Sequence, residues 1–379
     1  MSTAPIRPNQ VSKASQLEMK LLFTRIQQLE SLPLPSYSML ELSSIIKNDP
    51  GDHNAVASSI EHDHVMLAQL LRLFYKSFPG VEPASIRDAV EMLTIERLKQ
   101  LMYVPRMLDS FDRMEEIEWN HSYSCRILME SILEDNGIEN PHLILAAHLH
   151  DIGKNVFRDW SPKKYKIVEN HAESSKNVPM YKLETAVLQT NHSETGAELL
   201  RAWGFHDEVW KVVAQHHHHE DALPEEYLFE TALLQFVNYI DCTVRGIPCD
   251  PPTKKLMKAA HIAEIDEAGY INSQRTLIDK LRAANAGSIR KNMMNELLAA
   301  EQAALNLTHI SNNGDTQQEE TNTAAPEEID PAPATTNISN QDEDEELFPD
   351  IDPDTYQPED VPASTAKREE ELLHKFGLK

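Results

Sequence analysis

A chain of 379 residues with 41% hydrophobic residues is long enough to bury a large core, so no disulfide framework is needed to hold a small fold together. Its three cysteines lack a paired spacing, which favours a reducing compartment, and we expect the cytoplasm. The net charge of -26 provides no basic stripe for direct nucleic-acid binding. The N-terminus lacks a signal-peptide core, and no run of about 18 apolar residues could span a bilayer, so we expect no membrane partner.

The acidity is concentrated at the C-terminal end. Residues 311–379 hold 19 acidic against 4 basic residues, a net of -15, whereas the preceding 310 residues hold 42 against 31, a net of -11. Asn, Thr, Pro, Ala, Asp and Glu dominate there, and such a composition buries too little apolar surface to order itself. We expect a disordered tail, in which the short apolar island at 346–351 is either solvated or a peptide that docks on a partner.

Helical periodicity extends from about Leu17 to Leu307 without an alternating strand pattern, so the sequence predicts an all-α fold. The first expected helices cover residues 17–32, 37–47, 54–61, 65–76, 86–93 and 96–109, with Pro105 interrupting the last. A second set begins near Trp119, runs through Leu133, and continues at 143–152, 162–174, 182–190, 194–203, 207–217 and 226–244. Beyond Pro251 we expect helices 254–260 and 273–307, packed on the second set.

An apolar segment that begins after Pro141 is followed by residues whose side chains can bind a metal ion or a phosphate. This sequence is His148-Leu149-His150-Asp151-Ile152-Gly153-Lys154. His150 and Asp151 therefore fall near the last turn of a buried helix, where they could hold a metal ion. Lys154 shares a helix face with them and could contact a phosphate oxygen. In the alternative interpretation, Gly153 ends the helix and Lys154 complements its dipole.

Further potential ligands recur downstream and upstream on predicted helices: His121, His192, His216, His217 and Asp241. Each alone has an ordinary explanation, since a histidine suits a helix end and Asp241 could pair with Arg245 four residues on. Together, however, imidazoles and carboxylates are the ligands that suit borderline and hard divalent metals. A buried carboxylate such as Asp241 also needs a charge partner, which a cation would supply.

The order of these residues resembles the HD superfamily of metal-dependent phosphohydrolases. The resemblance implies a metal site of His121, His150, Asp151 and Asp241, with His192, His216 and His217 as candidates for a second metal and Asp151 bridging the two. One or two divalent ions such as Fe or Mn would be bound. Lys154 would be the phosphate-contacting lysine, so Asp151 and Lys154 are the candidate catalytic residues.

The chain is more similar to one branch, the HDOD domains, HD-related output domains of bacterial signalling proteins. The segments at 32–35, 59–63, 67–73 and 85–93 resemble their N-terminal half, and those at 120–122, 150–154, 192–203 and 216–217 their second half. This implies an HD-like helical bundle with an additional N-terminal helical subdomain. We expect a flexible N-terminus (1–16), an N-terminal half (17–112), a metal-site half (113–250), C-terminal helices (251–310) and the acidic tail (311–379).

Two functions follow from this resemblance, and the sequence leaves both open. HDOD domains are generally regulatory, which implies a cytoplasmic bacterial signalling module that binds a metal and a protein partner or a small phosphate-containing ligand. The complete ligand set instead implies an active phosphohydrolase that acts on a nucleotide or phosphoester. Hydrolysis of cyclic di-GMP is not expected, since no Gly-Tyr-Pro follows His217.

Other candidate residues have ordinary explanations. We expect His53, His62, His64, His142 and His148 at the surface or at helix ends, and Cys125 and Cys242 as core thiols.

Overall fold

The computed structural model describes residues 13–101, 107–108, 113–175 and 177–286. All of them lie in one compact unit of the chain, and its second unit, residues 292–370, lies outside them. The expectations for residues 1–12, the acidic tail and the helix beyond residue 286 therefore fall outside the described residues, whereas residues 13–16 of the expected flexible N-terminus belong to the first helix, Lys13–Gln28.

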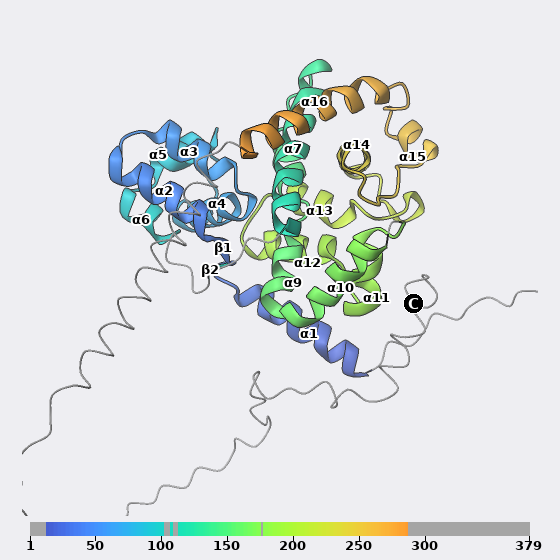
Figure 1. Cartoon of the computed structure of the whole chain (residues 1–379), viewed down its shortest axis with the longest axis horizontal. Helices are drawn as coiled ribbons and strands as arrows, with labels where there is room; N and C mark the ends of the chain where they lie inside the picture. The colour runs from blue at the N-terminus through green and yellow to red at the C-terminus, as the bar shows by residue number, and fades with distance from the viewer. Residues whose placement is uncertain (1–12, 102–106, 109–112, 176, 287–379) are drawn as a thin grey trace, which may run out of the picture. The chain divides into compact units, whose positions relative to one another are not determined.

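The described part of the N-terminal half consists of six helices, of which the first packs on a helix of the second half and the other five lie together (Figure 1). They are α1 (Lys13–Gln28), α2 (Ser36–Asn48), α3 (His53–Glu61), α4 (His64–Ser77), α5 (Ile86–Met92) and α6 (Ile95–Gln100). Side-chain caps explain where several of them begin: Asp63 accepts from the amides of Val65 and Met66, and Ser85 from that of Asp88. The predicted positions of these helices are confirmed to within a few residues, except at the end of the last one.

The predicted helix at 96–109 is wrong at residues 107 and 108. Helix α6 ends at Gln100, and Met107–Leu108 (β2) instead pairs in parallel with Leu34–Pro35 (β1), which forms a two-residue ladder inside an otherwise helical fold. The sequence analysis expected Pro105 to interrupt this helix, because proline cannot donate a helical hydrogen bond and disfavours a helical residue before it.

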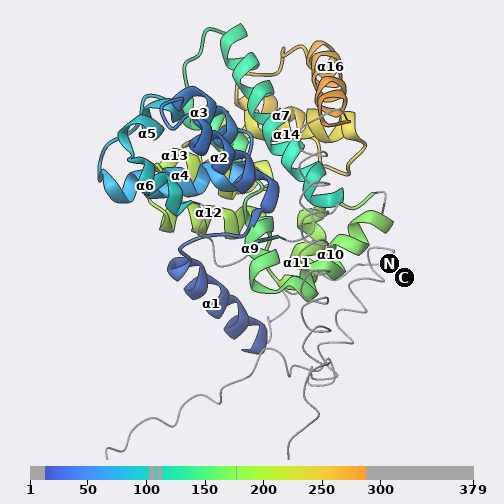
Figure 2. The same cartoon turned by 60° about the vertical axis from the view of Figure 1, so that its left-hand side comes forward.

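The second half contains the helices that carry the predicted site. They are α7 (Arg113–Asp135), α8 (Pro141–Leu149), α9 (Gly153–Trp160), α10 (Pro162–Ser174), α11 (Met180–Leu188), α12 (His192–Ala202), α13 (Asp207–Gln215), the 3-10 turn η1 (Glu220–Ala222), α14 (Leu228–Arg245), α15 (Lys254–Ala259) and α16 (Glu267–Ala286). Helix α7 packs on α8, α14 and α16, while α12 packs on α9 and α13 (Figure 2). The all-α prediction is confirmed. No helix in the described ranges has the length and apolar composition needed to cross a membrane.

The sequence prediction missed helix α9, which begins at the glycine interpreted there as a helix end. Gly153 is the first residue of α9, and its backbone lies directly against α12. A β-carbon on Gly153 would lie 2.1 Å from the His192 carbonyl oxygen, and one on Gly196 would lie 3.0 Å from the Gly153 nitrogen. The absence of a side chain at both glycines lets α9 and α12 approach closely at the predicted site.

Candidate metal centre

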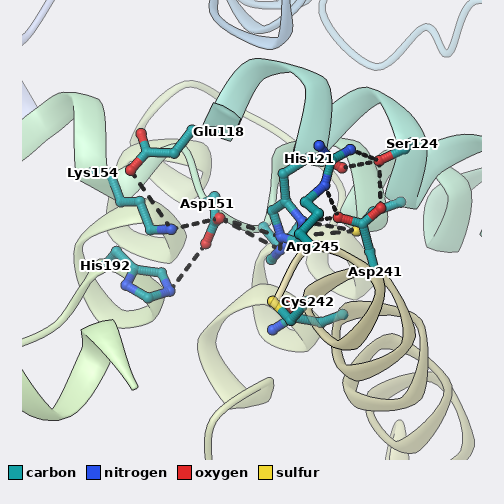
Figure 3. A network of polar contacts seen from close by, with 12 residues as sticks. Glu118, His121, Ser124, Asp151, Lys154, His192, Asp241, Cys242 and Arg245 are labelled. Atoms are coloured by element: carbon teal, nitrogen blue, oxygen red, sulfur yellow. Dashed lines mark hydrogen bonds and ion pairs between the residues drawn. The ribbon is translucent and has the colours of Figure 1, made fainter. Parts of the chain in front are cut away.

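The structure gathers the predicted ligands where four helices and one interhelical turn meet. His121 lies on α7, His150 ends α8, His192 begins α12 and His216 ends α13. Asp151 lies among them in the turn between α8 and α9 (Figure 3). Asn191 fixes the start of α12, because its side chain accepts hydrogen bonds from the amides of Ser193 and Glu194. Residues from 121 to 217 of the chain thus converge on one buried point.

Four of these histidines are held in the same way, with Nδ1 bonded to an oxygen acceptor. The acceptor is Asp241 for His121 (2.5 Å), the Ala147 carbonyl for His150 (2.8 Å), Glu184 for His192 (2.6 Å) and the Val213 carbonyl for His216 (2.6 Å). Carboxylates and backbone carbonyls commonly orient metal-binding histidines through this second nitrogen. The arrangement leaves each Nε2 to face the centre.

The Nε2 atoms face one another at the separation expected of shared ligation. His121 Nε2 lies 3.1 Å from His150 Nε2, and His192 Nε2 lies 2.9 Å from His217 Nε2. Two nitrogens bound at about 2.1 Å to one ion lie about 3.0 Å apart when they subtend 90° and about 3.4 Å apart in a tetrahedral site. The Nε2 atom of His216 is buried without a hydrogen-bond partner. These residues therefore fit a cation, which would satisfy nitrogens that the protein leaves facing each other.

Asp151 is the carboxylate common to both histidine groups. Its Oδ1 lies 3.1 Å from His192 Nε2, and its Oδ2 lies 3.6 Å from His121 Nε2 and 3.7 Å from His150 Nε2. The Lys154 ammonium donates to Oδ2 at 2.7 Å. Possible ligand atoms of His150, Asp151 and His216 all lie within 4.8 Å of one another, as do those of His192, His216 and His217. Asp151 is thus placed to contact one ion beside His121 and His150 and another beside His192.

Burial and charge set the protonation of the centre. Burial alone would raise the pKa of Asp151, but Lys154 and the neighbouring histidines hold that pKa well below its usual range. Burial lowers the pKa of His150 to about 4 and that of His216 well below its ordinary value. His192 behaves in the opposite way: burial would lower its pKa, but Glu184 and Asp151 raise it to about 9. At neutral pH the metal-free centre therefore holds an ionised Asp151, neutral His150 and His216, and a protonated His192.

Asp241 is in contact with the other predicted ligands only through His121. Its Oδ2 accepts from His121 Nδ1 and from Arg245 Nε, each at 2.5 Å, and its Oδ1 accepts from Ser124 at 2.6 Å and from Gln274 at 2.5 Å (Figure 3). The pairing with Arg245, given above as the ordinary explanation, is therefore present. A ligand role for Asp241 stays a prediction, and in this structure its carboxylate orients the ring of His121.

Two buried acids and their partners escaped sequence reasoning. Glu184 is fully buried on α11 and accepts from both the amide and the Nδ1 of His192, and from the Tyr165 hydroxyl at 3.0 Å. Glu118 pairs with Arg158 at 2.7 Å and lies 3.9 Å from the Lys154 ammonium. Little in the sequence indicates that these two acids are buried, because each lies in a helix whose other polar residues are typical of a solvent-facing side.

His148 lies at a helix end, which was one of its two expected positions, but its side chain is buried. It lies in the last turn of α8 and is only 1% exposed, and neither ring nitrogen has a hydrogen-bond partner. Burial lowers the pKa of His148 well below its ordinary value, so the ring is neutral. Its ring packs near Tyr123, and it is in none of the groups of side chains near enough to share an ion in the described structure.

A cavity of 380 Å³ opens beside the centre. Its polar wall includes His121, Asp151, Lys154, His192 and His217. Its apolar lining includes Val178, Pro179 and Met180 at the start of α11, and Ile247 and Pro248 after α14. The predicted site residues thus border a space large enough for a small ligand.

The carboxylate of Glu184 gives a test of how His192 is held. In a Glu184→Gln variant we expect the affinity for a divalent metal to fall by roughly 10- to 100-fold, because an orienting partner of a ligand loses its charge. The pKa of His192 should also fall from about 9, since the Glu184 charge is the main factor that raises it. Chelator competition and NMR titration of the His192 ring measure the two effects. Glu173→Gln, which removes an exposed charge at the same cavity, is the control, and an equal loss in both variants would contradict the role of Glu184.

The fold and the histidine-aspartate centre define a class of protein, an all-helical HD-like domain. The sequence matches the family model of the HDOD domain over residues 32–219, and the chain is an HDOD-domain protein.

An uncharacterized protein of Treponema pallidum is 25% identical over 250 residues, which are 63% of this chain and 47% of that protein. The chain thus spans about half the length of this relative. Among solved structures, a virulence factor from Campylobacter jejuni is similar with a TM-score of 0.51 and 16% identity, over 70% of this chain and 98% of that one. An HDOD domain protein of unknown function from Geobacter sulfurreducens shows 18% identity and a TM-score of 0.37, over 74% and 98% of the two chains.

Proposed function

We propose that this HDOD-domain protein is a signalling module that binds a divalent metal ion in the centre around Asp151 and responds to a protein partner or to a small phosphate-containing ligand. One observation carries the proposal: buried ligand atoms of His150, Asp151 and His216 lie within 4.8 Å of one another, and His216 Nε2 has no partner. A regulatory output is what the family resemblance implies. The ions that suit this imidazole and carboxylate set include Fe and Mn.

His121, His150, Asp151, His192, His216 and His217 are the residues that would hold one or two ions. When bound, a divalent metal would clamp the helix ends and would supply Lewis acidity that lowers the pKa of a bound water. The protein's own contribution is to orient the histidines through Nδ1, to keep Asp151 ionised and to exclude bulk water from the centre. None of these contributions requires catalytic turnover, so the centre is compatible with a metal ion whose role is to hold the helix ends together.

A second candidate function, metal-dependent hydrolysis of a phosphoester, is favoured by the cavity. Its wall joins four predicted ligands to the ammonium of Lys154: His121, Asp151, His192 and His217. A phosphoryl group placed there would meet both the metal residues and that cation. In this arrangement, however, the Lys154 ammonium already contacts Asp151 at 2.7 Å and Glu118 at 3.9 Å, so it would have to share its charge with the ligand.

Metal analysis separates the candidates. Protein purified without an affinity tag should contain about one or two equivalents of a divalent metal per chain, and it should then be assayed against phosphoesters and nucleotides with Mn or Fe. Metal without turnover supports the signalling module, and turnover that is lost in Lys154→Met while the metal is retained supports the hydrolase. Absence of bound metal under all conditions would overturn both.

The affinity for metal should depend on pH in one direction. Coordination requires a neutral imidazole, whereas His192 in the metal-free protein keeps its proton up to a pKa of about 9. Metal binding therefore releases a proton below that pH, and the affinity should rise by up to about tenfold per pH unit between pH 7 and 9, then level off. Competition titrations in non-coordinating buffers measure it. In Glu184→Gln the plateau should begin at lower pH, and an affinity that is constant between pH 7 and 9 would contradict His192 as a ligand.

A further inference from the structure

A second group of potential ligands lies at the opposite ends of two helices that carry the centre. Helices α8 and α13 run side by side in the same direction, because His142 stacks on His206 at their starts and His150 meets His216 at their ends. His142 lies about 12 Å along α8 from His150, at 1.5 Å per residue. The helix pair therefore brings histidines together at both ends, and only one end belongs to the HD-type centre.

The group consists of His142, His206 and Glu208. One ligand atom from each lies within 4.8 Å of the others, and His142 Nδ1 is 3.5 Å from Glu208 Oε2. The two imidazole rings stack with centroids 4.1 Å apart and planes 14° apart. Two ligands bound to a tetrahedral zinc ion lie about 3.4 Å apart, so the distance from His142 to Glu208 already matches one edge of that tetrahedron.

The surrounding residues hold the carboxylate in place. Asn140 accepts from the Leu143 amide as the cap of α8, and its side-chain amide donates to Glu208 Oε1 at 2.6 Å. This leaves Oε2 toward His142. Ligating carboxylates are commonly fixed by such a second hydrogen bond. His206 accepts a long bond, 3.3 Å, from the Glu208 amide, so an ion at that nitrogen would displace only a weak interaction.

We infer that His142, His206 and Glu208 form a second, peripheral metal site that takes a zinc-type divalent ion, with water completing the coordination. The ligand set of two imidazoles and one carboxylate is a common one for zinc with an open fourth position. His206 is exposed, and the other two residues are partly buried, so an ion can enter from solvent and the exposed ring can turn toward it. The ion would tie the start of α8 to the segment that precedes α13. This inference does not depend on metal binding at the central site.

Zinc titration of the full chain without a tag tests the inference. The wild type should bind one more equivalent of zinc than either His142→Gln or His206→Gln, and zinc should raise the melting temperature of the wild type more than that of either variant. His142→Gln leaves the α13 cap at His206 intact, so agreement between the two variants excludes a folding effect. His219→Gln is the matched control, because it removes an exposed histidine of the His216–His219 run and should keep the equivalent.

The outcomes are distinguishable from those of the central site. If the central site binds no metal, the wild type should still lose one equivalent on substitution of His206. Equal stoichiometry in the wild type and in both glutamine variants would overturn the inference. It would also be overturned if the extra equivalent bound only at millimolar zinc, which would indicate an adventitious ion only.

Discussion

Replacement of Asp151 by alanine is expected to reduce the divalent metal content of the purified protein from stoichiometric to background. Asp151 is 3% exposed, and its oxygens are the ones that approach His121, His150 and His192. No other carboxylate among the described residues contacts both the pair His121 and His150 and the pair His192 and His217. Elemental analysis of the tag-free protein and chelator competition measure the loss. An Asp151→Ala protein that retains its full metal content would contradict the assignment of the centre.

The same change should also lower the free energy of unfolding of the metal-free protein by about 3 kcal/mol. It removes the 2.7 Å partner of the Lys154 ammonium and leaves a buried cation whose remaining neighbour, Glu118, is shared with Arg158. Asp151→Asn separates the two effects, since an amide of the same size can still accept from Lys154 but brings no charge to a metal. We expect it to lose metal with a smaller loss of stability. Asp279→Asn, on the exposed side of α16, should change either quantity little.

The order of ligand-type residues, through its resemblance to HD domains, predicted which residues would meet, except that Asp241 contacts the others only through His121. The other predicted ligands lie on helices or in the turns that follow them, and the packing of those helices brings them together: His121, His150, Asp151, His192, His216 and His217. Helix α12 was predicted from residue 194, and the cap at Asn191 places its first residue at His192 instead. The HDOD resemblance, which rested on these same segments, is confirmed by the match over residues 32–219.

What could not be predicted is how the ligands are supported. Glu184 and Glu118 lie on helices that also carry solvent-facing charges, and only the packing of α11 and α7 against their neighbours shows that these two acids point inward. The same holds for His148, whose position in a last turn is equally consistent with exposure. For Asp241, sequence offered both a ligand role and a pair with Arg245, and local spacing could establish only the second.

The alternative interpretation of Gly153 as the end of a helix is not what the structure shows. The physical reason is that glycine both ends helices and permits close contact, two uses that sequence does not distinguish. A Gly153→Ala variant now tests the contact. The added β-carbon would lie 2.1 Å from the His192 carbonyl oxygen, 2.6 Å from Thr195 Oγ1 and 2.7 Å from the Gly196 nitrogen. Two of these atoms are backbone, so α9 and α12 must separate.

We expect this substitution to lower the free energy of unfolding by about 3 kcal/mol, at the upper end of the usual cost of overpacking, because rigid backbone cannot yield as a side chain would. It should also weaken metal binding, since the separation moves His192 on α12 away from Asp151 beside α9. Denaturant unfolding and metal competition measure the two losses. Gly51→Ala is the control, because its β-carbon would lie at an ordinary 3.4 Å from Asp49 on an exposed turn. A Gly153→Ala protein as stable as Gly51→Ala, with unchanged metal affinity, would show that α9 and α12 can separate without disturbing the centre.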